Sequence, residues 1–171
     1  MAWDRHFERW VAGHRAGFLN PIFEGLTYAG TYGAIWLGIG ILLAVLTARR
    51  LILVWAVAAI GAGEIASDLL KAAIPRSRPH VDALVHRPHT HSFPSGHATI
   101  SFACATVLGA AAPRLRLPLY LLAAAIGWSR AYVGVHYPLD VIGGALLGTG
   151  LGYALVKLLP RVGSARRVEM P

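Results

Sequence analysis

Residues 25–48 read GLTYAGTYGAIWLGIGILLAVLTA and contain no charged side chain. An α-helix rises about 1.5 Å per residue, so a run of this length spans about 36 Å, enough to cross a hydrocarbon core of about 30 Å. Arg49 and Arg50 end the run. The stretch therefore predicts a transmembrane helix, which we place at residues 26–48.

Further apolar runs follow along the chain. The run that begins at Leu51 continues as a helical pattern to Ile74 and stops before Pro75, because proline disfavours a helical conformation at the preceding residue. Five transmembrane helices are predicted, at residues 26–48, 51–74, 96–112, 117–136 and 139–159. Buried helices of a soluble bundle are the alternative for the shorter runs.

The composition favours a membrane protein of the all-α class. Of the 171 residues, 56% are hydrophobic and only 14% are charged, whereas charged residues make up about 25% of ordinary soluble domains. This balance argues against a disordered chain, a coiled coil and a disulfide scaffold. The single cysteine, Cys104, lies inside an apolar run and is interpreted as a packing residue.

The N-terminal segment has an amphipathic pattern. Trp3, Phe7, Trp10, Val11 and Phe18 recur at helical spacing, with charged residues between them. This pattern predicts a helix that lies in the membrane interface within residues 1–25; a helix packed on the bundle is the alternative. The whole chain, residues 1–171, is predicted to be one domain, with a transmembrane core at 26–159 and a cytoplasmic tail at 160–171.

The net charge is +8, and the cations lie between apolar runs rather than on one polar face, which argues against a nucleic-acid partner. With five spans, the turns at 49–50 and 113–117 and the C-terminal tail share one side of the membrane. That side has more Lys and Arg than the other side, when Lys71, Arg78 and Arg130 are left out of the count for the other side because they are candidate site residues. The positive-inside rule then predicts a plasma-membrane protein with a cytoplasmic C-terminus and an outward-facing loop at 75–95.

Several ionisable residues fall within or beside the predicted spans, where each costs roughly 2.5–3.5 kcal/mol on insertion scales and is by default a functional hypothesis. They are Glu64, Asp68, Lys71, Arg130, His136 and Asp140. Glu64, Asp68 and Lys71 are spaced to share one helix face. For the two acids, the structural alternative is a buried Asp68–Lys71 ion pair with Glu64 bonded to a neighbouring helix.

Two further patterns point to an anion site. Ser95, Gly96 and His97 open the third predicted span, and a helix start presents free N–H groups and a positive dipole end to an anion. His136 and Asp140 are four residues apart, so the carboxylate can fix the imidazole tautomer and leave the other nitrogen free as a nucleophile or base. With the nearby cations, these residues predict a phosphate site.

Three segments carry a family resemblance. Residues 71–79, KAAIPRSRP, resemble the K-x6-R-P motif of the type 2 phosphatidic acid phosphatase superfamily. Residues 94–97, PSGH, resemble its second motif, and residues 129–140 resemble its third, S-R-x5-H-x3-D. All three are complete, in order and at the family's spacing.

The resemblance implies a membrane phosphohydrolase that needs no metal or cofactor and works through a phosphohistidine. His136 would attack phosphorus, Asp140 would orient it, and His97 would act as general acid and base. The residues implied to bind phosphate are Lys71, Arg78, Ser95, Gly96, Ser129 and Arg130. The implied substrate is a lipid phosphate, with an undecaprenyl-type polyprenyl diphosphate as first choice and phosphatidylglycerophosphate or phosphatidate as the alternative.

Three other interpretations stay open at the level of sequence. A transporter or scramblase would use the same cations to carry anionic lipids. The histidines of the polar loop, His86, His89 and His91, have spacing that would suit zinc. Gly144, Gly148 and Gly152 form a stripe of small residues that would serve either a homodimer or packing within the monomer.

Overall fold

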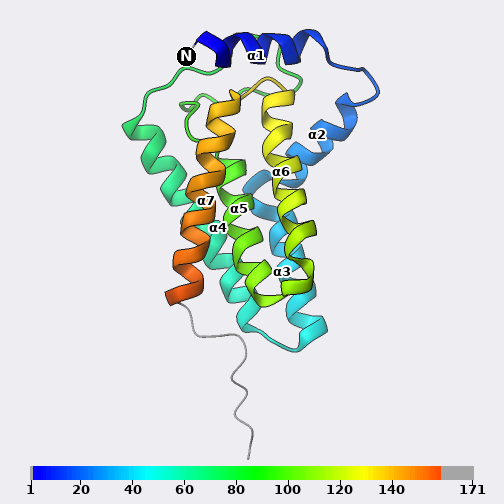
Figure 1. Cartoon of the computed structure of the whole chain (residues 1–171), viewed down its shortest axis with the longest axis vertical. Helices are drawn as coiled ribbons and strands as arrows, with labels where there is room; N and C mark the ends of the chain where they lie inside the picture. Colours follow the sequence, from blue (N-terminus) through cyan, green and yellow to red (C-terminus); the bar gives the residue numbers. More distant parts are fainter. Residues whose placement is uncertain (1, 159–171) are drawn as a thin grey trace, which may run out of the picture.

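A computed structural model describes residues 2–158 of the chain. Within them the chain forms seven α-helices, two short 3₁₀-helices and no strand, which confirms the all-α class (Figure 1). The elements are α1 (Ala2–Gly13), α2 (Asn20–Ala29), η1 (Thr31–Gly33), α3 (Ala34–Thr47), α4 (Leu51–Ala73), α5 (Gly96–Ala111), η2 (Pro113–Leu115), α6 (Arg116–Tyr132) and α7 (Pro138–Leu158). The predicted tail at 160–171 lies outside the described residues.

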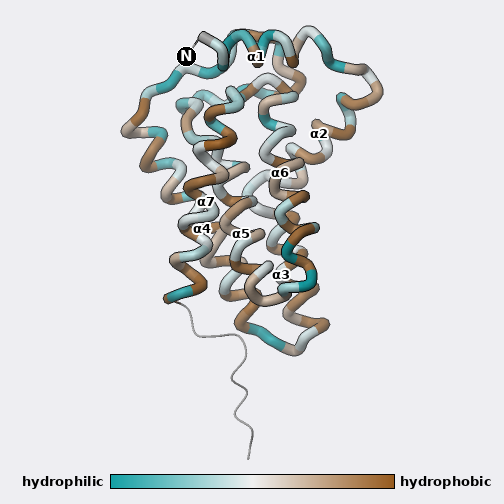
Figure 2. The backbone as a smooth tube through the Cα atoms, viewed as in Figure 1, coloured by the Kyte–Doolittle hydropathy of each residue, from teal (hydrophilic) through white to brown (hydrophobic). Residues whose placement is uncertain are grey.

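Helix α5 is the centre of the bundle, and α4, α6 and α7 pack around it (Figure 1). Small side chains make this possible: Ala98, Ala103 and Ala105 are completely buried, as is Cys104, whose interpretation as a packing residue is confirmed. Large apolar side chains such as Trp36 and Ile52 fill the space between α3, α4 and α5. Apolar side chains cover the outer faces of the long helices, where Val57, Ile65 and Leu146 are exposed (Figure 2).

The stripe of small residues on α7 packs against α5. Gly144, Gly148 and Gly152 are buried, and each brings the α7 backbone close to α5. A Cβ atom at Gly144 would lie 2.6 Å from the Ser95 carbonyl oxygen. The face is therefore occupied within the monomer, as the alternative of packing within the monomer predicts.

Replacing Gly148 by alanine is expected to destabilise the bundle by about 1–3 kcal/mol, the usual cost of overpacking. The new Cβ would overlap the carbonyl oxygen of Thr99, and backbone cannot move aside as a side chain can. Gly150, on the same helix, has nothing within 4 Å of its Cβ position, so G150A is the matched control. Thermal unfolding in detergent checks this: equal midpoints for the two variants would contradict it.

The predicted helix at 26–48 is not continuous. It is divided into α2 and α3, which meet at an angle of 55°. Tyr32 and Gly33 at the break have left-handed backbone angles, with φ of 51° and 72°, and a Cβ on Gly33 would lie 2.9 Å from Ile60. The prediction of one continuous helix was wrong because the absence of charge was used to place it, whereas the break is set by the backbone around Gly33.

Two helices in the described part, α4 and α7, are long and apolar enough to cross a membrane, and the bent pair α2–α3 would supply a third span. Helices α5 and α6 contain 16 and 17 residues. The predicted span at 117–136 ends earlier than expected, because α6 stops at Tyr132 and a buried turn at 133–137 leads into α7. His136 therefore lies on a turn between two helices.

Helix α1 lies across one end of the bundle, roughly perpendicular to the long helices (Figure 1). It ends at Gly13, so Phe18 lies beyond it, and the predicted apolar face is only partly buried. Asp4, Glu8 and Val11 are buried, whereas Trp3 and Trp10 are 52% and 53% exposed. Asp4 faces inward because it pairs with Arg76 of the loop at 74–95. The alternative of a helix packed on the bundle is thus correct for the acidic face.

Glu8, on the buried face of α1, makes the stability of the folded protein depend on pH. Burial raises the pKa of the Glu8 carboxyl from 4.5 to about 7, even though Arg15 and Arg87 oppose the shift. A carboxyl whose folded-state pKa is raised stabilises the fold below the unfolded pKa, and this contribution is lost as the pH rises through about 7. We expect E8Q to match the wild-type unfolding midpoint at pH 5 and to exceed it at pH 8. A wild-type advantage at pH 8 would contradict this.

Candidate active site

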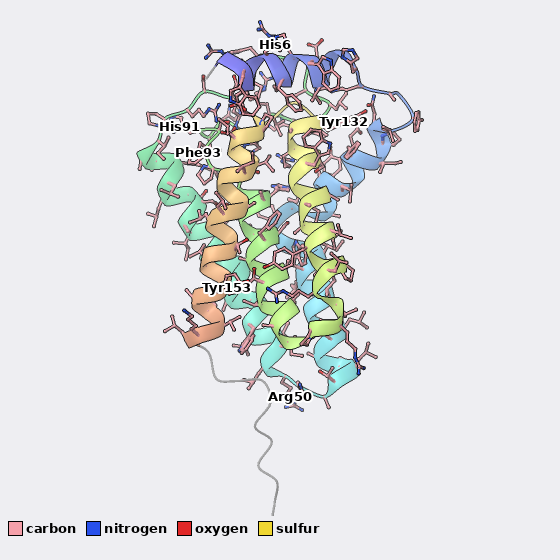
Figure 3. All side chains as sticks on the ribbon, viewed as in Figure 1. His6, Arg50, His91, Phe93, Tyr132 and Tyr153 are labelled. Carbon is pink, nitrogen blue, oxygen red and sulfur yellow. The ribbon has the colours of Figure 1, made fainter. Side chains whose placement is uncertain are left out.

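A pocket of about 400 Å³ opens near the end of the bundle that α1 covers. Its walls come from α2 and η1, α4, the loop at 74–95, the first turn of α5, the last turn of α6 and the turn at 133–137. Six of the nine predicted site residues line it: Lys71, Arg78, Gly96, His97, Arg130 and His136. Figure 3 places His91 and Phe93 of the loop at this end of the molecule, whereas Arg50 lies at the other.

The His136 ring is buried, with its two nitrogens facing different partners. Nε2 lies 3.1 Å from Nη1 of Arg78. A guanidinium only donates hydrogen bonds, so Nε2 must be the acceptor, and a neutral ring then carries its proton on Nδ1. Nδ1 lies 3.5 Å from Oδ2 of Asp140, a distance at which attraction is electrostatic. The arrangement leaves the Nε2 lone pair facing the cationic side of the pocket.

Asp140 lies behind His136 and does not line the pocket. Its Oδ2 accepts hydrogen bonds from the Ser92 hydroxyl and from the Tyr137 N–H, the latter at 2.9 Å. Its Oδ1 accepts a hydrogen bond from Nη1 of Arg76 at 2.5 Å. The carboxylate is thus held on both oxygens. Arg76 and Ser92 were not predicted, because they lie 64 and 48 residues from Asp140 in the chain and no local spacing connects them.

Arg78 is held by the backbone around it. Its guanidinium donates to the carbonyl of Thr90 at 2.8 Å and to that of Val135 at 2.9 Å. Burial lowers the pKa of this guanidinium from its ordinary value, but arginine stays charged at neutral pH. Because none of its bonds is to a carboxylate, its charge is left to attract an anion in the pocket.

Two more cations complete this side of the pocket. Arg130 is 5% exposed, and its buried Nε has no hydrogen-bond partner among residues 2–158. Lys71 pairs with Asp68 at 2.8 Å and lies beside the start of α5, where a Cβ on Gly96 would be 3.5 Å from Nζ. Phosphate oxygens would satisfy these donors.

His97 projects from the first turn of α5. Its Nε2 lies 3.1 Å from the carbonyl oxygen of Thr27 on α2. A carbonyl only accepts, so Nε2 carries a proton, and Nδ1 is left as the nitrogen that can exchange a proton with a ligand. Thr27 was not predicted, and it reaches His97 only because the chain bends after α2.

Two predicted phosphate ligands do not line the pocket. The Ser95 hydroxyl accepts a hydrogen bond from the Ala98 N–H at 3.5 Å as the N-cap of α5. The Ser129 hydroxyl bonds to the Thr27 hydroxyl at 2.8 Å and to the Ile126 carbonyl at 2.7 Å. Both hydroxyls therefore have structural partners, and we leave Ser95 and Ser129 out of the proposed phosphate cradle.

The acids of α4 also border the pocket. Glu64 and Asp68 line it with Lys71. The predicted Asp68–Lys71 pair is present, but the Asp68 side chain is 60% exposed, so the pair is not buried as expected. This side of the pocket is consequently less cationic than the side formed by Arg78 and Arg130.

The zinc interpretation requires histidines that converge on one point. The rings of His86 and His89 are 5.8 Å apart, and Nδ1 of His91 faces the Lys71 carbonyl oxygen at 2.8 Å. Among residues 2–158 no group of three or more His, Cys, Asp or Glu side chains is placed to hold a metal ion. The loop therefore lacks the ligand set that this interpretation needs within the described chain.

A family model described as PAP2 superfamily matches residues 52–164. The chain belongs to the PAP2 superfamily. This match confirms the resemblance drawn from the three motifs, since it spans all of them. This PAP2 protein is a membrane lipid phosphatase, a hydrolase of phosphate esters or diphosphates.

Relatives of this PAP2 protein act on different lipid phosphates, to judge by their names. Decaprenylphosphoryl-5-phosphoribose phosphatase from Mycobacterium tuberculosis is 37% identical over 134 residues, 75% of this chain and 74% of that one. An undecaprenyl-diphosphatase from Sulfolobus acidocaldarius is 38% identical over 84 residues, 48% of this chain and 40% of that one. The crystal structure of a PAP2-type phosphatidylglycerolphosphate phosphatase from Bacillus subtilis has a TM-score of 0.76 at 26% identity, covering 92% of this chain and 84% of that one.

Proposed function

We propose that this PAP2 phosphatase hydrolyses a polyprenyl-linked phosphate through a phosphohistidine on His136. The observation that carries the mechanism is the geometry of His136: its Nε2 faces Arg78 as an acceptor, and its Nδ1 faces Asp140. Such a ring is a nucleophile that needs no deprotonation before it attacks. Three cations and two further histidines, His86 and His97, share its pocket.

In the first step, Nε2 of His136 forms a bond to phosphorus while the bond from phosphorus to the leaving oxygen breaks. His97 enters this step protonated on both nitrogens, donates its Nδ1 proton to that oxygen and becomes neutral. The His136 ring becomes positively charged, and the Asp140 carboxylate 3.5 Å from Nδ1 stabilises this charge.

In the second step, Nδ1 of His97 takes a proton from water, and the water oxygen attacks phosphorus. The bond between nitrogen and phosphorus breaks, phosphate leaves, and His136 returns to its neutral form. In both steps the cations Lys71, Arg78 and Arg130 and the N–H of Gly96 hold the phosphoryl oxygens. Positioning and charge stabilisation supply most of the rate in phosphoryl transfer.

The substrate class rests on the relatives and on the place of the pocket. Two of the relatives described above act, by their names, on polyprenyl lipids. We keep undecaprenyl-type diphosphate as the first choice, with phosphatidylglycerophosphate or phosphatidate as the alternative. An amphiphile fits a pocket at the end of an apolar bundle, because its head group enters the pocket while its tails stay in lipid.

We also propose the predicted topology of five spans: the bent pair α2–α3, α4, α5, α6 and α7. Helices of 16 and 17 residues rise about 25 Å, close to a hydrocarbon thickness of about 30 Å. Arg49, Arg50, Arg114, Arg116 and Lys157 belong to the end of the bundle away from α1. The positive-inside rule makes that end cytoplasmic, and the pocket then faces outward.

Phosphate release from purified protein in detergent tests the proposal. The panel contains a polyprenyl diphosphate, phosphatidylglycerophosphate, phosphatidate and a soluble phosphate ester, each with and without chelator. We expect the highest kcat/KM on the polyprenyl substrate, full activity in chelator, and inhibition by vanadate, which mimics the five-coordinate phosphorus. No release from any lipid would refute the proposal and favour a lipid transporter, and loss of activity in chelator would refute the metal-free mechanism.

A further inference from the structure

Asp4 of α1 reaches the active-site carboxylate through one arginine. Nη2 of Arg76 pairs with Oδ2 of Asp4, and Nη1 of the same guanidinium pairs with Oδ1 of Asp140 at 2.5 Å. Both carboxylates are fully buried. The guanidinium thus bridges the cap helix and the residue behind His136, two elements that lie at opposite ends of the chain.

Further contacts fix this bridge in place. The other oxygen of Asp4, Oδ1, accepts the Leu139 N–H of the first turn of α7 at 3.2 Å. The Arg76 guanidinium also lies over the Tyr137 ring, 4.4 Å from its centroid. Asp4 consequently holds both the arginine and the helix start that carries Asp140.

The charges explain why a second carboxylate is needed. Asp4, Arg76 and Asp140 together carry one net negative charge. The atom of this cluster that faces His136 is Oδ2 of Asp140, 3.5 Å from Nδ1 of the ring. When the ring becomes cationic, that charge is neutralised. Without Asp4, the positive charge of Arg76 would offset Asp140, and less negative charge would remain to stabilise the ring.

We propose that Asp4 is a positioning residue for phosphoryl transfer, which acts through Arg76 to orient Asp140 and to keep its charge available to His136. The inference rests on the proposed role of His136 as nucleophile. It makes α1 part of the active site as well as a cap on the bundle. Asp4 itself does not line the pocket.

The test compares two buried carboxyls of α1. D4N removes the one that pairs with Arg76, and E8Q removes one that forms no salt bridge with that arginine within residues 2–158. We expect D4N to lower kcat by about 10- to 100-fold, the usual cost of losing a group that orients a catalytic residue, with KM within about threefold of wild type. E8Q should keep the wild-type kcat. Equal losses in the two variants would reduce Asp4 to a packing role and overturn the inference.

A double-mutant cycle shows whether Asp4 acts through Arg76. In an R76Q background, D4N should lower kcat little further, because the arginine that Asp4 balances is gone. The same fold loss in both backgrounds would overturn the inference. If D4N does not fold, R76K serves instead: a lysine keeps the charge but lacks the planar guanidinium whose two terminal nitrogens each bond one carboxylate, so an unchanged kcat in R76K would count against the bridge.

Wild type and H136A are assayed in parallel so that the two proposals fail separately. If H136A is inactive and D4N retains the wild-type kcat, the positioning role of Asp4 is wrong and the nucleophile assignment stands. If wild type and H136A release phosphate equally, the proposed function is wrong, and the inference about Asp4 falls with it.

Discussion

Replacing His136 by alanine is expected to reduce phosphate release by at least about 10⁴-fold, because loss of a covalent nucleophile has effects of this size or more. The two other histidines that line the pocket are His86 and His97, and Nε2 of His97 is bonded to the Thr27 carbonyl. The cations of the pocket remain in H136A, so a lipid phosphate should still bind. The expected pattern is retained binding with lost turnover.

Two measurements make this result specific. Brief reaction with a ³²P-labelled lipid phosphate should leave acid-labile, alkali-stable label on wild type and none on H136A. His80 lies in the loop at 74–95, is exposed and does not line the pocket, so H80A is the control and should keep full activity. Residual activity of H136A near the wild-type level would exclude His136 as the nucleophile.

Replacing His97 by alanine is expected to lower the rate on a lipid phosphate by about 10²–10⁴-fold, the range for loss of a general acid and base. The effect should depend on the leaving group. An aryl phosphate releases a weakly basic phenolate that needs little protonation, so its first step should be affected far less. Hydrolysis of the phosphohistidine still requires a base, and the intermediate should therefore accumulate on H97A.

Rapid-quench kinetics with the two substrates checks this prediction. The measured quantities are the burst of phenolate and the fraction of protein that carries the label at steady state. H89A is the control, because His89 is exposed and does not line the pocket. Equal rate losses on lipid and aryl substrates, without accumulation of labelled protein, would show that His97 does not transfer the proton.

Patterns over short stretches of the sequence predicted most of the helices and several of the residues that line the pocket. Apolar runs placed α4, α5 and α7 to within one or two residues, because the signals for a helix in lipid are local. The three motifs also singled out residues that line one pocket, although they are up to 65 positions apart in the chain. These sequence patterns did not predict contacts between segments that are distant in the chain. The contacts are those of Thr27 with His97, Ser92 with Asp140, and Arg76 with Asp4.

The amino-acid sequence by itself determined the all-helical membrane class, the family and the residues that gather around the pocket, because these depend on composition and on close spacing along helices. Only the tertiary structure decided which face of α1 is buried, where the first apolar run bends, and how Asp140 is held. Hydrophobic periodicity would bury Trp3 and Trp10, yet Asp4 and Glu8 face inward. The reason for Asp4 is electrostatic: its buried carboxylate pairs with Arg76 from a loop distant in the chain, and periodicity contains no information about such a partner.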